Sequence, residues 1–207
     1  MKPSFNSNKK LLGNYQFAFR NARRAYEDFV PVLDSVVRLR KHGNMGIGHL
    51  TLFFHSMGNN ILRETVRKGR LPEINSTVWV DNLVLNAPCV PQKHHKEWLD
   101  KVQFAKRIYV HYNPEDHVLK GAHLVSFRKQ LGEKVRKPIS THAVYINFHP
   151  LAGENHSNFL VLLQHPVPPQ SLLAYYHSLL HGNAVNIADT IHFRRSGYRG
   201  IGVEFVQ

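Results

Sequence analysis

Four short apolar segments alternate with segments of helical composition along this chain, and this alternation most constrains the fold. The apolar segments are rich in β-branched and aromatic residues, as buried strands are, and they span residues 49–54, 77–86, 107–112 and 143–148. The helical segments cover residues 57–70, 92–105, 118–131, 157–163 and 169–180. Successive βα units with right-handed crossovers predict a parallel sheet with helices on both faces, which is a three-layer α/β sandwich.

The two ends of the chain are less regular. Apolar residues at three- and four-residue spacing predict a helix from about residue 14 to 41, which Pro31 should kink or split. Residues 1–13 are polar and are expected to be flexible. Residues 183–207 form an uncertain tail, in which residues 201–206 have the composition of a small strand.

Length and composition favour one globular domain over residues 1–207. The chain is 43% hydrophobic and 20% charged, and 207 residues are enough for one well-buried core but few for two. Cys89 is the single cysteine, so no intrachain disulfide can form. The sequence shows neither a secretory signal at its start nor an apolar stretch long enough to span a bilayer. We therefore expect a cytoplasmic protein.

The chain is strongly basic, with 27 Lys+Arg against 14 Asp+Glu and a formal net charge of +13. Such a charge attracts polyanions, so nucleic acid or anionic lipid is one class of partner to consider. The basic residues are scattered in short groups without a nucleic-acid-binding module, which favours an ordinary solvated surface. The 15 histidines show no metal-ligand spacing, and the sequence predicts neither a metal site nor a cofactor.

Ligands of parallel sheets bind beyond the carboxyl ends of the strands, so reactive side chains are expected at those positions. The sequence His55-Ser56-Met57-Gly58 follows the first strand, where a tight turn into a helix would expose the serine hydroxyl as a nucleophile. The Met57 amide could donate to an oxyanion, and Gly58 is expected to let the helix approach the strand closely. Helix capping is the alternative interpretation of Ser56.

Two further residues complete a candidate set. Asp116 follows the third strand, and His156 lies in a polar loop after the fourth. A histidine can take the serine proton, and a carboxylate can orient that histidine. Glu115 is an alternative acid, His149 is an alternative base, and Asp116 could equally cap a helix. The order serine, acid, histidine is that of α/β hydrolases.

These segments resemble bacterial α/β hydrolases with an HSMGN signature, a group of mostly uncharacterised esterase-like proteins. The resemblance covers about residues 14–182 and rests on HLTLFFHSMGNNIL, NLVLNAPCV, IYVHYNPEDHVLKGAHLVSFRKQLG and GENHSNFL. It implies Ser56 as nucleophile, Asp116 as acid and His156 as base. It also implies hydrolysis of a carboxylic ester or similar acyl bond, on a small-molecule substrate and without a cofactor.

The chain departs from that pattern in two places. Phe54 stands two residues before the serine, where the family usually has glycine or alanine because a helix returns close by. The strands that precede the serine in the family, and the loop that gives a second oxyanion amide, have no counterpart before residue 49, so we expect a sheet truncated on its N-terminal side. Tyr15 and Tyr26 are candidates to assist the oxyanion site.

A truncated sheet would have an open edge. Residues 1–20 could cover it, two copies could pair through it as a homodimer, or the chain could be part of a longer protein. The leading hypothesis for function is a serine esterase that forms an acyl-enzyme. The alternatives are a catalytically impaired α/β-hydrolase fold that only binds its ligand, and an accessory protein that binds anions through its basic charge.

Overall fold

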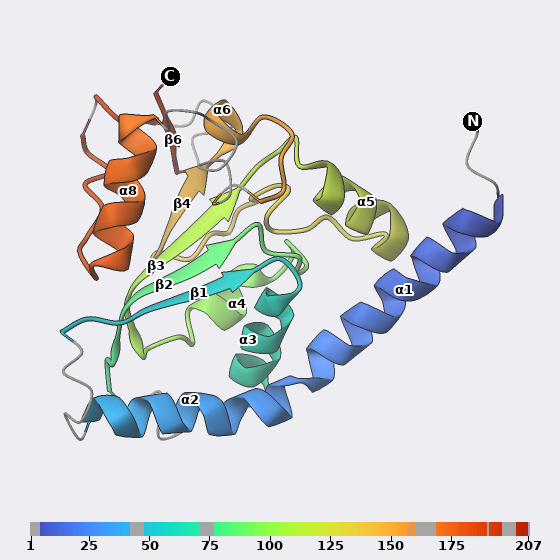
Figure 1. Cartoon of the computed structure of the whole chain (residues 1–207), viewed down its shortest axis with the longest axis horizontal. Helices are drawn as coiled ribbons and strands as arrows, with labels where there is room; N and C mark the ends of the chain where they lie inside the picture. Colours follow the sequence, from blue (N-terminus) through green and yellow to red (C-terminus); the bar gives the residue numbers. More distant parts are fainter. Residues whose placement is uncertain are drawn as a thin grey trace.

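A computed structural model describes residues 5–41, 48–70, 77–157, 159, 169–189, 191–195 and 202–206. Within these residues the chain forms a six-stranded sheet in the order β1-β2-β3-β4-β6-β5 (Figure 1). The strands are β1 (Thr51–His55), β2 (Val80–Asn86), β3 (Ala105–Tyr112), β4 (Ala143–Asn147), β5 (Phe193–Arg195) and β6 (Val203–Phe205). All neighbouring pairs are parallel except β5 and β6, which are antiparallel. The predicted α/β fold is confirmed.

Helices cover both faces of this sheet. They are α1 (Phe5–Arg24), α2 (Tyr26–Lys41), α3 (Gly58–Arg67), α4 (His95–Leu99), α5 (His117–Ser126), α6 (His149–Ala152) and α8 (Gln170–Leu180). Leu83 and Leu85 of β2 join a buried cluster with α2, α3 and α4, whereas Val84 between them joins a second cluster with α8. Alternate residues of one strand thus face two separate layers, as the pleat of a strand requires (Figure 1).

The N-terminal helical segment divides at Ala25, and not at Pro31 as expected. Pro31 lies inside α2, where its missing N–H leaves only the carbonyl of Glu27 without a helical donor. The Phe29 ring of α2 packs edge-on against Phe54 of β1, with the ring centroids 5.6 Å apart. It is therefore α2 that packs beside the edge strand β1, while α1, which includes the described part of residues 1–20, contacts α3 and α5.

Two predicted helices are shorter in the structure. The helix expected over 92–105 is reduced to α4, because β3 already begins at Ala105. The helix expected over 118–131 ends at Ser126, after which Phe127 adopts a left-handed conformation with φ of 54°. The chain then turns back, and Gln130 forms an antiparallel bridge with Pro91.

The first helix, α1, begins at Phe5, about nine residues before the predicted start and within the segment 1–13 that was expected to be flexible. The remaining elements lie within a few residues of their predicted bounds, with three differences. The short helix α6 and the strand β5 have no counterpart in the sequence prediction. The helix predicted at 157–163 falls mostly outside the described residues. No helix in the described part of the chain is both long and apolar enough to cross a bilayer.

Candidate active site

Ser56 occupies a strained turn between β1 and α3. Its φ of 49° lies in the left-handed region, which is uncommon for a residue with a side chain and concentrates at functional sites. Three backbone hydrogen bonds hold the turn: the Ser56 amide donates to the carbonyl of Asn86 at 3.0 Å, and the Ser56 carbonyl accepts from Asn59 and Cys89, both at 3.2 Å. This conformation directs the hydroxyl away from the strand at the end of the sheet.

Ser56, His156 and Asp116 are hydrogen-bonded in series. His156 Nε2 lies 2.8 Å from Ser56 Oγ, and His156 Nδ1 lies 2.7 Å from Asp116 Oδ2. The Asp116 side chain is fully buried, and that of His156 is 13% exposed. Because a carboxylate only accepts, Nδ1 carries the proton and Nε2 is left to accept from the serine hydroxyl. The arrangement can therefore draw a proton from Ser56.

The alternative acid and base do not join this series. Glu115 Oε2 lies 2.5 Å from Nζ of Lys120 in a partly exposed ion pair. The exposed His149 ring instead donates through Nδ1 to the carbonyl of Gly153 at 3.3 Å. Five residues were considered from sequence as nucleophile, acid or base. Of these, the structure brings together Ser56, Asp116 and His156.

Asn113, which the sequence analysis did not single out, links the loops of the acid and the base. It follows β3 and is buried, with 1% of its surface exposed. Its Nδ2 donates to the carbonyl of Gly153 at 2.8 Å and to that of Asn155 at 3.2 Å. A polar residue directly after a buried strand was the available signal, but its partners lie 40 and 42 residues away.

A polar chain, buried at Asn86 and His111 and half-buried at His55, runs across three strands to the side of His156. The sheet register pairs His55 with Asn86 and Asn86 with His111. Asn86 Nδ2 donates to His55 Nδ1 at 2.9 Å, and His111 Nδ1 donates to Asn86 Oδ1 at 3.0 Å. His111 Nε2 then accepts from the hydroxyl of Tyr175 at 2.5 Å. These roles are consistent only if both histidines are neutral.

Burial explains why these two histidines are neutral. Burial lowers the pKa of His111 to about 3. Burial and, next, the charge that His156 can carry lower the pKa of His55 to about 4. The His55 and His156 rings lie 4.8 Å apart, centroid to centroid. His55 therefore adds no positive charge beside the candidate base near neutral pH.

Met57 lies where an oxyanion donor is expected, at the N-terminal end of α3, where backbone amides have no carbonyl partner within the helix. The Met57 side chain packs on a small buried cluster that contains Cys89, and Tyr15 of α1 packs on the same cluster. The Tyr15 hydroxyl is 3.6 Å from Cys89 Sγ, while that of Tyr26 donates to Glu27 at 2.9 Å. Both hydroxyls therefore have partners other than Ser56. Burial raises the pKa of the Cys89 thiol to about 11.

The close backbone approach expected at Gly58 is wrong. A Cβ added to Gly58 would meet no atom within 4 Å, because α3 leaves the strand with open space on that side. A tight approach is found instead at Gly132, where a Cβ would lie 2.5 Å from the Ala87 carbonyl carbon and 2.6 Å from the Pro88 nitrogen. Phe54 fits because its side chain is buried against α2.

In the part of the chain that the structure describes, no three His, Cys, Asp or Glu side chains lie together as a set that could hold a metal ion.

A mostly parallel sheet flanked by helices, with a serine on the strand-to-helix turn, is the architecture of α/β hydrolases. Residues 18–142 match the family described as alpha/beta hydrolase of unknown function (DUF900), which is more than half of the chain. The chain therefore belongs to this family. The matched range contains Ser56 and Asp116 and ends before His156. Searches of curated proteins and of solved structures gave no match.

Proposed function

We propose that this protein is a serine hydrolase that cleaves carboxylic esters or similar acyl bonds through an acyl-enzyme. The observation that supports this proposal best is the series Ser56–His156–Asp116, with its contacts of 2.8 and 2.7 Å. A serine hydroxyl is a weak nucleophile unless a base lies beside it, and this one has both a base and an acid that orients the base.

The proposed reaction begins with attack of Ser56 Oγ on the carbonyl carbon of the substrate, while His156 Nε2 takes the hydroxyl proton. Asp116 stabilises the imidazolium that results. The Met57 amide donates to the oxyanion, helped by the N-terminal field of α3. The C–O bond to the leaving alcohol then breaks, and His156 gives that alcohol its proton. Water then attacks the acyl carbon while His156 takes one of its protons. The bond between that carbon and Ser56 Oγ breaks, Oγ receives the proton from His156, and the acid is released.

Labelling with a fluorophosphonate, read by intact mass, tests the proposal directly. We expect one adduct per chain in the wild type and none in Ser56→Ala, because the reagent reacts with activated serines. Ser157→Ala is the matched control: Ser157 lies beside His156 but outside the hydrogen-bonded series, so this variant should label like the wild type.

The result also separates the two hypotheses for this fold. Absence of labelling in a folded, monodisperse wild type would overturn the hydrolase proposal and favour a fold that binds its ligand without cleaving it. Labelling that persists in Ser56→Ala would mean that another nucleophile reacts. If Ser56 labels, a panel of nitrophenyl esters of increasing acyl length is the next measurement.

A further inference from the structure

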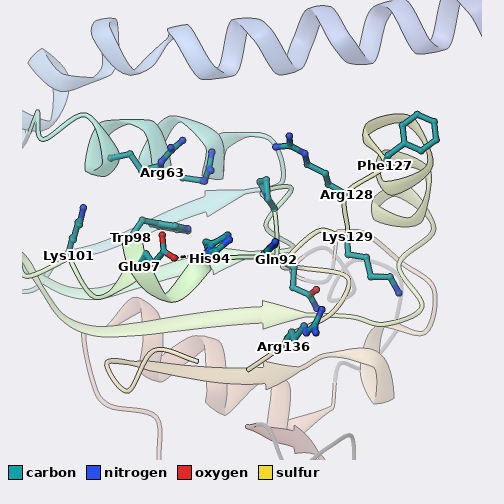
Figure 2. Close-up of a pocket in the computed structure, with 13 residues that line it drawn as sticks. Arg63, Gln92, His94, Glu97, Trp98, Lys101, Phe127, Arg128, Lys129 and Arg136 are labelled. Atoms are coloured by element: carbon teal, nitrogen blue, oxygen red, sulfur yellow. Dashed lines mark hydrogen bonds and ion pairs between the residues drawn. The ribbon is translucent and has the colours of Figure 1, made fainter. Parts of the chain in front are cut away.

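A cavity of about 720 Å³ lies between α3, the segment 91–101 and the segment 127–136 (Figure 2). Its volume is within the usual range of small-molecule sites. Backbone hydrogen bonds join two of its walls: the Gln92 amide donates to Lys129 at 2.8 Å, and the Leu131 amide donates to Val90 at 2.8 Å. The cavity is thus built into the fold. None of Ser56, Asp116 and His156 lines it.

The lining of this cavity is strongly basic. Seven lysines and arginines face it and only one carboxylate, that of Glu97. They come from three parts of the chain, so the positive charges converge from different directions. Arg63 and Arg67 belong to α3, and Arg128 follows α5; Figure 2 shows Arg128 reaching back across the opening toward the side of Arg63.

Neighbouring carboxylates neutralise this charge only in part. The buried Glu64 presents one oxygen, Oε1, to three guanidinium groups: Arg63 at 2.8 Å, Arg23 at 3.3 Å and Arg67 at 3.4 Å. Among the residues that the structure describes, Arg128 and Arg136 form no ion pair. Burial and the nearby Arg67 lower the pKa of Arg63 to about 10, which still leaves it charged at neutral pH.

One wall of the cavity is aromatic. Trp98 of α4 is buried, with 3% of its surface exposed, and it lines the cavity. Its indole N–H has no acceptor among the described residues, which is unusual for a buried donor. The wall beside the guanidinium groups thus contains a buried aromatic side chain whose polar atom has no partner among the described residues.

We propose that this cavity binds a compact ligand that carries two or more phosphate groups. Guanidinium groups bind phosphate oxygens through paired charge-assisted hydrogen bonds, and several of them facing one hollow match a ligand with clustered charge. A nucleic acid duplex, by contrast, spreads its charge along a surface. This site is separate from the proposed hydrolase chemistry and does not depend on it.

The same phosphate chemistry has two sources, a free phosphorylated compound or a lipid headgroup. Phe127 is 91% exposed at the rim, next to Arg128 and Lys129, so an aromatic ring stands beside the cationic opening. Sodium tripolyphosphate represents the first source, and vesicles of phosphatidylcholine with or without a bisphosphorylated phosphoinositide represent the second.

Calorimetric titration with tripolyphosphate and vesicle co-sedimentation test the proposal on the full chain. We expect saturable one-to-one binding that weakens as NaCl is added. Arg128→Gln with Arg136→Gln should weaken binding at least about tenfold, because each lost guanidinium removes a charge-assisted hydrogen bond. Both side chains are exposed, so the fold should tolerate these changes. Lys106→Gln with Arg195→Gln is the control, since it removes the same charge from exposed positions outside the cavity.

Tripolyphosphate binding that is lost in the cavity pair and kept in the control pair supports the proposal and indicates a free ligand. The same pattern seen only with phosphoinositide vesicles supports it and indicates a headgroup. Equal weakening in both pairs, or binding to neither probe, overturns it. Tight binding of a DNA duplex that tripolyphosphate does not displace also overturns it. Ser56→Ala should bind as the wild type does, so a failed labelling experiment leaves this test intact.

Discussion

Asp116 contacts His156 with one carboxylate oxygen and caps a helix with the other. Oδ2 lies 2.7 Å from His156 Nδ1, and Oδ1 accepts from the Leu119 amide at 2.9 Å at the start of α5. The two interpretations offered for this residue from sequence, acid and helix cap, are therefore compatible in geometry. The helix holds the carboxylate in place, and the carboxylate faces the imidazole in a fixed direction.

Asp116→Asn should separate the two roles. Asparagine caps helices as well as aspartate does, so the thermal midpoint should change by only a few degrees. Its amide would donate to Nδ1 and leave the proton on Nε2, which opposes removal of the serine proton. Turnover should fall by about 10³–10⁴, on the scale of the same change in a serine protease. Asp116→Ala should lose a further ~1 kcal/mol of stability with the cap. Unchanged ester turnover in Asp116→Asn would contradict this role.

Asn113 is expected to position the base. Asn113→Ala removes both hydrogen bonds to the loop of His156, so the rate of fluorophosphonate labelling should fall about tenfold or more, as for a misplaced catalytic group. His149→Ala is the matched control in the same region, because its ring is exposed and outside the series. A labelling rate equal to the wild type in Asn113→Ala would show that the loop is held by other contacts.

The serine turn and the strands could be predicted because their signals are local. Leu83, Val84 and Leu85 in the middle of β2 are consecutive apolar residues and all buried, as a central parallel strand requires. The end of α5 could not be predicted in this way. Helix formers continue past Ser126, but Gln130 pairs with Pro91, a partner that only the folded chain brings near.

The same limit applies to the polar chain behind the site. His55, Asn86 and His111 look like isolated polar residues at the ends of three apolar strands. They become one chain only because the parallel register places them side by side. The register depends on packing between distant segments, so these contacts are invisible to periodicity. The positions of Ser56, Asp116 and His156 depended less on register, because the ends of all parallel strands meet at one edge.

Gly132→Ala and Gly58→Ala should change the free energy of unfolding in opposite directions. A Cβ at Gly132 would overlap the backbone of Ala87 and Pro88, so we expect a loss of at least about 2 kcal/mol in the free energy of unfolding. Gly58→Ala meets open space at the start of α3 and should gain between about 0.4 and 1 kcal/mol. Urea unfolding of both variants measures the difference. Destabilisation by Gly58→Ala would contradict the open space at this position and would indicate the close helix–strand approach that was expected from sequence.

Stability should fall in mild acid because of the buried histidines. In the folded chain the pKa values of His111 and His55 are about 3 and about 4, whereas the ordinary value, which applies in the unfolded chain, is 6.5. Below pH 6.5 the unfolded chain binds protons that the folded chain does not. The stability present above pH 6.5 is therefore lost as pH falls toward 4, by up to about 1.4 kcal/mol per pH unit for each group. Urea midpoints from pH 7.5 to 4.5 should show a shallower slope in His111→Gln; an unchanged slope would contradict the assignment.

Phe54 should matter for stability far more than its neighbour. Phe54→Ala removes a buried ring from the contact between β1 and α2, and should cost about 3–5 kcal/mol. Phe53→Ala, on the opposite side of the same strand and 36% exposed, should cost about 1 kcal/mol or less. Equal losses in urea unfolding would indicate that α2 does not depend on this ring.

The candidate base and its acid are 40 residues apart in the chain, and the base and the serine are 100 apart. Such separations make the site a late product of folding, since each contact closes a long loop. On the ribosome, a chain that has emerged only as far as β3 would hold the serine and lack the histidine, and so would be chemically silent. The labelling of Ser56 during refolding would then report the time at which the three segments come together.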